Sequence, residues 1–382
     1  MIAAINPADN PLSLEFYRLL WHNFAPAILP FVVACGVTVG LVPVMRRLSF
    51  RVGAVSLPGG RNINVRPTAR LGGLALAGGF IVAGAVFGLG RGFSNREVLT
   101  MLGAGAVTVG VLAVDDVRQL RARWTLSLQL VVAVGVAAAG AITINFINFG
   151  GGHILHLGVL AFPVTLLWIL GMENTMNFLD GVDGLAAGVS AIVALALLLA
   201  AVNRETEDPS QLAVVVLCAA LIGACAGFLF FNFHPARIFM GGGAHFLGLT
   251  LAILSIFGIA KGAVVFALMV PVMALVIPIA DTGWSIVRRR RQQISIAHPD
   301  TAHIHHQLLD FGLSQRETCL VIYFATGITS GIGLMLYGHR KILGVVVVLL
   351  LVALSTLLGQ RLYELENGPA ERADAKGPLL ES

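Results

Sequence analysis

The chain alternates between long apolar runs and short polar connections. Apolar runs of about 20 residues fall near 24–45, 71–90, 97–114, 124–146, 158–178, 184–202, 211–231, 244–260, 263–287, 318–337 and 341–360. A helix of about 20 apolar residues spans the roughly 30 Å hydrocarbon core of a bilayer. The pattern therefore predicts an all-α, polytopic integral membrane protein with about 11 transmembrane helices.

The polar connections are too short to hold a soluble domain. The longest of them covers about residues 288–317, and the chain ends in a polar segment over residues 362–382. We expect one membrane domain over residues 1–361. The segment 362–382 is expected to be a disordered tail, because it has too little apolar surface to offset the entropy of ordering.

Composition supports the membrane assignment and adds an orientation. Of the 382 residues, 57% are hydrophobic and 12% are charged, whereas typical soluble domains are about a quarter charged. Most of the 25 basic residues fall in alternate connections. Because cytoplasmic loops are enriched in arginine and lysine, we expect an outside N-terminus and a cytoplasmic C-terminus. The net charge of +5 is spread along the chain, which argues against nucleic-acid binding.

Polar residues of chemical interest gather at the arginine-rich face of the predicted bundle. They are Asp115 and Asp116, then Asn174, Asn177, Asp180 and Asp183, then Asn232, His234 and Arg237, and finally Asp281, His303, His305 and His306. Ionisable groups at membrane depth are costly, so they mark functional candidates. Because these clusters share one face, we predict a single active site built from loops at the cytoplasmic interface.

One cluster carries the oxygen donors of a candidate metal site. Asn174, Asn177 and Asp180 recur every three residues, so they share one face of a helix. Asp183 follows in a glycine-containing segment, where the backbone is free to approach a ligand. Such oxygens suit Mg²⁺, which keeps several waters and binds substrate phosphates. The alternative is that these side chains are polar contacts between helices.

The acidic pair Asp115–Asp116 also has two interpretations. Neighbouring carboxylates raise one another's pKa unless a cation or an arginine intervenes, which suits a Mg²⁺ site or a general base. In the structural alternative, the pair closes a helix and binds Arg118 or Arg121.

Arginines and histidines of the same face are candidate anion-binding residues. Arg288–Arg291 precede His303, His305 and His306, and no cysteine or obvious fourth zinc ligand accompanies these histidines. The loop therefore fits phosphate or sugar recognition better than zinc, with topology marking as the alternative for the arginines. Arg70 belongs to a basic, turn-rich loop that suits an anionic head group, with the same alternative.

Together these motifs resemble the polyprenyl-phosphate N-acetylhexosamine-1-phosphate transferase superfamily from about residue 40 to residue 316. The most specific block is Asn174-Thr-Met-Asn-Phe-Leu-Asp-Gly-Val-Asp-Gly-Leu-Ala. Further matching blocks are residues 67–73, 114–116 and 231–241, then Asp281, Arg288-Arg289 and residues 299–314. The histidine loop is similar to that of the branch using simple UDP-N-acetylhexosamines, not UDP-MurNAc-pentapeptide.

The resemblance implies an enzyme of the bacterial inner membrane with its active site on the cytoplasmic side. Such an enzyme transfers a sugar 1-phosphate from a UDP-N-acetylhexosamine to undecaprenyl phosphate, releases UMP and starts a cell-surface glycan. Mg²⁺ is the implied cofactor, with Mn²⁺ as an alternative. Membrane lipids surround the protein, and a homodimer is a candidate assembly.

The resemblance also implies individual roles. Asp115 would deprotonate or orient the lipid phosphate, and Asp116 would support the metal or that phosphate. Asn177 would be a metal ligand, with Asp180 and Asp183 as catalytic residues of the metal or nucleotide environment. The residues implied in substrate binding are Arg70, Asn174, Asn232, Arg288, Arg289, His303, His305 and His306.

One departure from the family pattern bears on activity. After Phe-Met-Gly241 the family continues with an aspartate that is a principal Mg²⁺ ligand, whereas this chain has Gly242-Gly-Ala-His245. His245 or a nearby carboxylate is a candidate replacement ligand, although imidazole suits transition metals better than Mg²⁺. If the pocket is otherwise intact, Gly242→Asp should raise turnover or Mg²⁺ affinity.

The departure leaves other interpretations open. The protein is either an active enzyme, a paralogue with altered substrates, or a catalytically impaired protein that binds the lipid carrier or a partner. The retained acidic residues and histidine loop favour an active enzyme. A transporter is disfavoured, because transporters place such carboxylates near the membrane midplane.

Overall fold

The structure is a computed structural model that describes residues 14–58, 67–90, 94–139, 142–148, 154–202, 211–259 and 312–336, with isolated positions at 280–308 and at 353. In chain order the elements are α1 (Leu14–Val52), β1 (Val55–Ser56), β2 (Thr68–Ala69), α2 (Gly72–Gly88), α3 (Asn95–Arg118), α4 (Ala122–Ala139), β3 (Phe146–Asn148), β4 (Ile154–His156), the 3₁₀ turn η2 (Gly158–Leu160), α5 (Ala161–Leu179), α6 (Leu185–Val202), α7 (Gln211–Asn232), α8 (Gly243–Ile259) and α12 (Gln315–Leu336).

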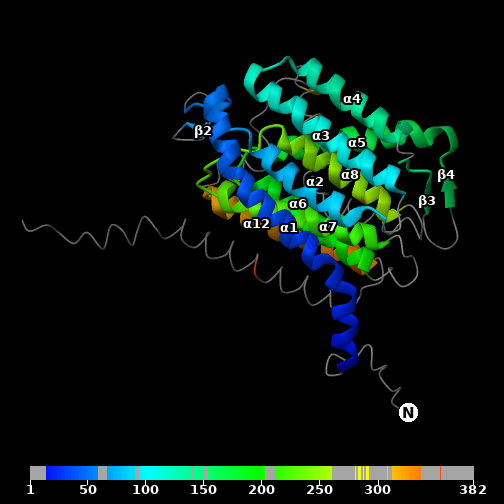
Figure 1. Cartoon of the computed structure of the whole chain (residues 1–382). Coiled ribbons are helices and arrows are strands. Elements are labelled where there is room, and N and C mark those ends of the chain that lie inside the picture. Colours follow the sequence, from blue (N-terminus) through cyan, green and yellow to red (C-terminus); the bar gives the residue numbers. More distant parts are fainter. Residues whose placement is uncertain are drawn as a thin grey trace, which may run out of the picture.

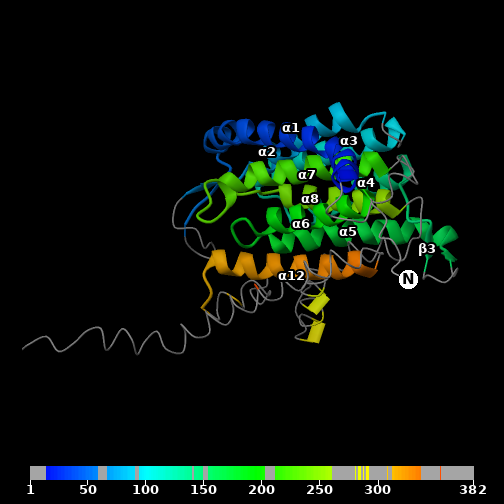
Figure 2. The same cartoon turned by 90° about the horizontal axis from the view of Figure 1, so that it is seen from below.

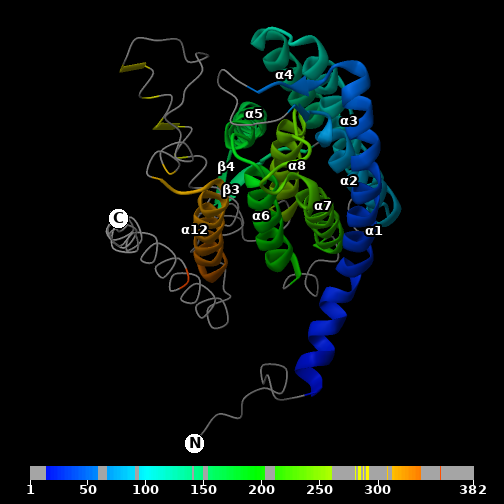
Figure 3. The ribbon, with the colours of Figure 1, turned by 90° about the vertical axis from the view of Figure 1, so that its left-hand side faces the viewer.

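The helices pack side by side in a bundle (Figure 1). The inner helix α7 packs against α1, α2 and α6, and most of its apolar residues are buried. Helix α5 packs against α8, and α12 packs against α6 (Figure 3). The core is mainly aliphatic and comes largely from α6, α7 and α8, with Phe228 and Phe246 among its largest buried side chains.

Within the described residues, six helices are long and apolar enough to cross a membrane. Three shorter apolar helices, Gly72–Gly88, Arg123–Ala138 and Gly243–Phe257, lie among them. These helices confirm a polytopic, all-α membrane protein. They do not establish the predicted number of 11 spans, because the expected runs 263–287 and 341–360 lie almost wholly outside the described residues.

Two short strand pairs interrupt the helical pattern. The run expected as one span over 124–146 is instead α4, which ends at Ala139, followed by the antiparallel pair β3–β4. Beyond the helix the backbone pairs with distant residues, because the N–H of Ile144 donates to Thr165 Oγ1 at 2.9 Å and the carbonyl of Asn145 accepts the N–H of Leu157 at 2.9 Å. The second antiparallel pair, β1–β2, joins Val55 to Ala69 and Ser56 to Thr68.

The two strand pairs lie at opposite ends of the bundle (Figures 1 and 2). At the β1–β2 end, α1, α3, α5 and α7 finish while α2, α6, α8 and α12 begin. Polar residues that follow different apolar runs are therefore brought to one end of the molecule. This arrangement positions the candidate site.

Candidate active site

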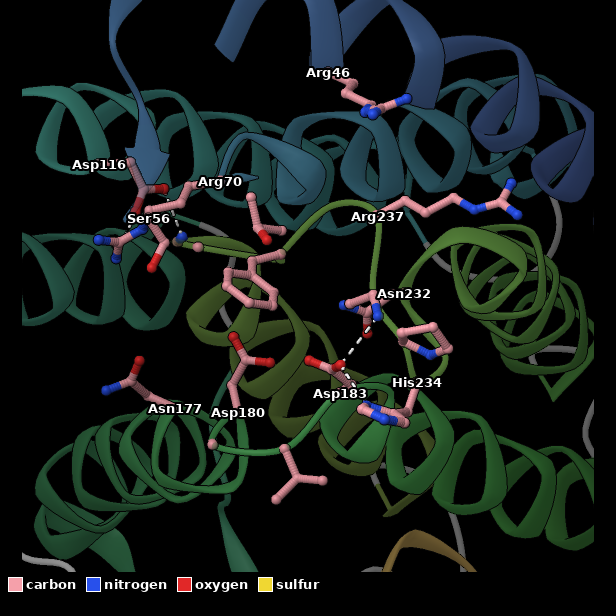
Figure 4. Close-up of a pocket in the computed structure, with 18 of the residues that line it drawn as sticks. Arg46, Ser56, Arg70, Asp116, Asn177, Asp180, Asp183, Asn232, His234 and Arg237 are labelled. Atoms are coloured by element: carbon pink, nitrogen blue, oxygen red, sulfur yellow. Dashed lines mark hydrogen bonds and ion pairs between the residues drawn. The ribbon is translucent and has the colours of Figure 1, made fainter. Parts of the chain in front are cut away.

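A pocket of about 1000 Å³ opens at the β1–β2 end of the bundle (Figure 4). Its polar and charged lining residues come from nearly every element that reaches this end. They are Arg46, Ser56, Thr68, Arg70, Asp115, Asp116, Asn177, Asp180, Asp183, Asn232, His234, Arg237, His245 and Gln315. The predicted clustering of the acidic segments with Asn232 and Arg70 is thus what the structure shows.

Asp116 is a buried carboxylate of the pocket and is bound on both oxygens. Its Oδ1 lies 3.2 Å from the Arg70 guanidinium, and its Oδ2 accepts a hydrogen bond from the backbone N–H of Gly242 at 3.0 Å. Because Gly242 directly precedes α8, Asp116 caps the N-terminus of that helix from the end of α3. The carboxylate therefore joins three elements as well as facing the pocket.

Asp115 lines the same pocket and also shapes the end of α3. Its Oδ1 accepts the backbone N–H of Leu120 at 2.6 Å, after Gln119 has turned into the left-handed region at φ 50°. Within the described residues, neither Arg118 nor Arg121 forms an ion pair with either carboxylate. One oxygen of Asp115 therefore stabilises the end of α3. The ion pair with Arg118 or Arg121 that the structural alternative predicted is not formed within the described residues.

Asp180 follows the last turn of α5 and has no side-chain hydrogen bond among the described residues. Burial raises its pKa from 3.8 to about 8, and the negative charges of Asp116 and Asp183 act in the same direction, against a smaller opposing effect of Arg70. Three carboxylates therefore interact electrostatically across the pocket (Figure 4). Such a group is stabilised by a cation or by protonation.

Asp183 and Asn232 fasten the turn after α5 to the loop after α7. Oδ2 of Asp183 accepts the backbone N–H of Ala236 at 3.0 Å and lies 2.9 Å from Nδ1 of His234. Asn232 accepts the N–H of Gly184 at 3.0 Å and donates to the carbonyl of Ile238 at 2.9 Å. Both side chains line the pocket, and their contacts hold these two segments together beside it.

Helix α12 completes this fastening. Cys319 Sγ donates to the carbonyl of Asp183 at 3.3 Å, and the Tyr323 hydroxyl donates to the carbonyl of Gly184 at 2.7 Å. Arg316 Nε donates to the carbonyl of His234 at 3.0 Å. The turn and the loop are thus bound to each other and to a third segment far along the chain.

A chain of side-chain hydrogen bonds runs from α5 through α4 to α8. Nδ2 of Asn174 donates to the carbonyl of Leu170 at 2.7 Å and to Oε1 of Gln129 at 3.1 Å. Nε2 of Gln129 lies 2.8 Å from Nδ1 of His245, which lines the pocket. Asn174 itself does not line the pocket, unlike the other described candidates. Its side-chain amide is hydrogen-bonded to other protein groups.

At Gly242 the structure leaves no room for a side chain. A Cβ added there would overlap Cβ of Leu112 and would lie 3.2 Å from the Leu112 backbone carbon. The expectation for Gly242→Asp assumed a pocket that lacks only a carboxylate. The structure differs, because Leu112 also fills the space beside residue 242. Helix α3 occupies the position that the aspartate would need.

The oxygen donors of the pocket are compatible with Mg²⁺. No group of three or more His, Cys, Asp or Glu side chains within the described residues forms a metal site in advance. Mg²⁺ requires less, since it is usually held by one or two carboxylates together with waters and substrate phosphates. Asp180 and the exposed amide of Asn177 supply such donors beside Asp116.

Several predicted site residues cannot be compared with the structure. Asp281, Arg288, Arg289, His303, His305 and His306 lie outside the described residues. Conversely, the structure adds Arg46, Ser56 and Gln315 to the pocket and Gln129 behind it. Gln129 carried a usable signal, because it is a polar residue inside an apolar run. The other three belong to polar segments whose pattern does not distinguish pocket residues from solvated ones.

Comparisons with known proteins identify the family of the chain. Residues 98–259 match the Glycosyl transferase family 4. The chain is 34% identical over 339 residues to a probable undecaprenyl-phosphate N-acetylglucosaminyl 1-phosphate transferase of Bacillus subtilis, covering 87% of this chain and 91% of the relative. It is 38% identical over 310 residues to a decaprenyl-phosphate N-acetylglucosaminephosphotransferase of Mycobacterium tuberculosis, covering 75% of this chain and 76% of the relative.

A third relative matches a shorter part of the chain. A phospho-N-acetylmuramoyl-pentapeptide-transferase of Pelotomaculum thermopropionicum is 34% identical over 225 residues, covering 53% of this chain and 64% of the relative. All three relatives are named as phospho-sugar transferases. The chain belongs to glycosyl transferase family 4, in the superfamily of polyprenyl-phosphate N-acetylhexosamine-1-phosphate transferases. It is a multi-pass membrane protein of that family.

Proposed function

We propose that the protein transfers N-acetylhexosamine 1-phosphate from a UDP-sugar to undecaprenyl or another polyprenyl phosphate, with release of UMP. The observation that carries the proposal is the pocket itself, where arginines and carboxylates from separate helices meet at one end of an apolar bundle. A lipid phosphate and a water-soluble nucleotide meet only at such an interface. The names of the relatives supply the substrate class.

The reaction is a phosphoryl transfer that needs positioning and charge neutralisation more than covalent chemistry. An oxygen of the lipid phosphate attacks the β-phosphorus of the UDP-sugar, and the bond from that phosphorus to the bridging oxygen breaks. UMP leaves with the bridging oxygen, and the sugar 1-phosphate is now bonded to the lipid phosphate, so that the product is a polyprenyl diphosphate sugar.

In this proposal Asp115 orients the attacking phosphate and accepts its proton, using the oxygen that does not bind Leu120. Arg46, Arg70 and Arg237 line the pocket as cations that counter the charge of the phosphates. Mg²⁺, or Mn²⁺ in its place, would be held by Asp180 and Asn177 near Asp116 and would neutralise diphosphate charge.

We further propose that the pocket faces the cytoplasm of a bacterial inner membrane. Arg46, Arg70 and Arg237 line the pocket, and Arg118 lies in the last turn of α3 at the same end. The positive-inside tendency favours the cytoplasm for such an end. A lipid carrier loaded on this side would start a cell-surface glycan.

The function is tested with the full chain purified in detergent or nanodiscs. We expect UMP release that requires both undecaprenyl phosphate and one of a panel of UDP-N-acetylhexosamines, in Mg²⁺ or Mn²⁺. Asp180→Asn and Asp115→Asn should each lower turnover by about 100-fold or more. Glu97→Gln is the matched control, because glutamine keeps the capping box at the far end of α3. Absence of UMP with every sugar nucleotide would contradict the proposal.

A second candidate function follows from Gly242, where the family's aspartate is absent. In that case the protein binds polyprenyl phosphate without turnover, as a carrier-binding or scaffolding protein. Binding of polyprenyl phosphate that persists in Asp115→Asn and Asp180→Asn, with no UMP from wild type, would favour this candidate.

A further inference from the structure

The side chain that reaches the pocket from the first turn of α8 is His245. Position 242 is closed by Leu112, so α8 brings no carboxylate to the pocket from that position. His245 is about 6% exposed and lines the pocket, two residues into the helix. The contribution of the first turn of α8 to the pocket therefore depends on which nitrogen of the His245 imidazole carries the proton.

Hydrogen-bond directions determine that state. Nδ2 of Asn174 lies 2.7 Å from the Leu170 carbonyl, which accepts hydrogen bonds but cannot donate one, so the Asn174 amide orientation is fixed. The same Nδ2 donates to Gln129, so the Gln129 oxygen must face Asn174. Nε2 of Gln129 then donates to Nδ1 of His245.

A nitrogen that accepts a hydrogen bond carries no proton, so Nδ1 of His245 is unprotonated. The neutral ring then has its proton on Nε2. Gln129 is only 2% exposed, which protects this arrangement from competition by water. A metal ligand at Nε2 would need the opposite tautomer, with Nδ1–H donating to its neighbour. The hydrogen-bond chain therefore favours a donor over a metal ligand.

We propose that His245 is a substrate-binding residue that donates a hydrogen bond from Nε2–H to a phosphate oxygen, with Gln129 and Asn174 as its positioning residues. The inference rests on the proposed function, because that function brings phosphates into this pocket. It replaces the interpretation of His245 as a substitute metal ligand. The phosphate that accepts this hydrogen bond belongs either to the lipid phosphate or to the sugar nucleotide.

The tautomer is tested first, without any turnover. In the full chain labelled with ¹⁵N-histidine, the His245 resonances are assigned by their loss in His245→Gln. We expect the neutral Nε2–H pattern at pH 7 in wild type, and a mixture of tautomers in Gln129→Met. Gln211→Met is the control, because Gln211 is a buried glutamine at the opposite end of α7. An Nδ1–H tautomer or a doubly protonated ring in wild type would overturn the proposal.

Kinetics then compare two amide replacements. The glutamine Nε2 of His245→Gln can reach the position of the imidazole Nε2, whereas His245→Asn reaches only the position of Nδ1. We expect His245→Gln to stay within about fivefold of wild type and His245→Asn to lose about 10- to 100-fold in kcat/KM, since a hydrogen bond to a charged group is lost. Equal loss in both variants would overturn the proposal.

To identify which substrate carries the phosphate that His245 contacts, each substrate is tested separately. Thermal shifts of wild type and His245→Asn are measured with undecaprenyl phosphate alone and with the UDP-sugar alone, and the substrate whose shift is lost in the variant contacts the donor. Loss of neither shift overturns the proposal. The ranking of Mg²⁺ over Mn²⁺ and Co²⁺ should be the same in wild type and both variants, whereas a changed ranking identifies a metal ligand.

Failure of the proposed function gives a different result. A wild type without UMP release contradicts the transferase, while the tautomer and the single-substrate thermal shifts still test the donor.

Discussion

At the scale of single residues, Gly242 shows how one backbone position limits what a pocket can hold. An added Cβ would overlap Cβ of Leu112, and both atoms are attached directly to helix or turn backbone. Rotamer changes cannot relieve such an overlap. An alanine at 112 would keep the obstructing Cβ, whereas a glycine would remove it.

We therefore expect Gly242→Asp alone to lower the melting temperature and to leave UMP release at or below the wild-type rate. Gly242→Asp combined with Leu112→Gly should recover part of the lost stability, beyond the sum of the single changes. Thermal unfolding in detergent measures this coupling, with Leu112→Gly alone as the reference. A faster and equally stable Gly242→Asp single variant would show that α3 yields at this point.

Asp180 gives a pH dependence whose sign follows from its raised pKa. The folded carboxylic acid has a pKa of about 8 against 3.8 when unperturbed, so the folded state holds a proton that the unfolded state has lost. Stability should therefore fall as pH rises from about 4 to about 8 in metal-free buffer. Asp180→Asn should flatten this decline, measured as melting temperature against pH, whereas Glu97→Gln should not. An unchanged slope in Asp180→Asn would assign the decline to other groups.

The sequence was sufficient to bring the acidic residues of the pocket to one face, but it did not show how their atoms are used. Asp115, Asp116, Asp180 and Asp183 follow separate apolar runs, and the alternation of spans places them at one face. Nothing local reveals that Asp183 binds the loop after α7. Such contacts join residues about 50 positions apart, so they depend on the packed bundle.

At the scale of elements, close packing of α5 and α8 depends on Gly248. A Cβ at this residue would lie 2.5 Å from Cα of Glu173 and 2.5 Å from the carbonyl oxygen of Met172, both in the backbone of α5. Small residues allow helices to approach in this way within membranes. The pair matters for the site, because α5 ends at Asn177–Asp180 and α8 begins beside Gly242.

Gly248→Ala should therefore push the two helices apart and destabilise the protein by about 1–3 kcal/mol. Gly171→Ala is the matched control on α5, because nothing lies within 4 Å of a Cβ there. That change should be neutral or stabilise by about 0.4–1 kcal/mol. Chemical or thermal unfolding in detergent compares the two, and equal effects would refute the packing argument.

Helix positions were more predictable than the strands. Apolar runs predict helices because a bilayer leaves the backbone no other local partner, and α5, α6 and α7 lie where expected. The pairs β1–β2 and β3–β4 contain only two or three residues per strand. Their pairing depends on distant partners such as Val55 and Ala69 rather than on periodicity, so hydropathy did not indicate them.

At the scale of the whole molecule, the β1–β2 pair and the β3–β4 pair mark opposite ends (Figure 1), and the pocket opens at the β1–β2 end. Arg121 is exposed in the connection from α3 to α4 at the pocket end, and Val159 is 91% exposed in η2 at the other end. In cells whose outer face alone is accessible, an impermeant maleimide should label Val159→Cys. It should label Arg121→Cys only after permeabilisation.

The native cysteines give a low background in this experiment, because Cys218, Cys225 and Cys319 are buried and Cys35 is partly buried. Unmodified protein measures what remains. Labelling of Arg121→Cys from outside, with Val159→Cys protected, would reverse the proposed orientation while leaving the two ends distinct.

The hydrogen bonds from α12 to the turn after α5 have a consequence for the synthesis of the protein. The carbonyls of Asp183 and Gly184 receive their hydrogen bonds from residues 136 and 139 positions later in the chain. At about 5–20 residues per second, a ribosome needs roughly 7–27 seconds to cover that distance. During this interval the nascent chain already carries the acidic residues of the pocket, but the turn that holds them has no partner for these carbonyls. The pocket end of the protein is therefore among the last parts to mature.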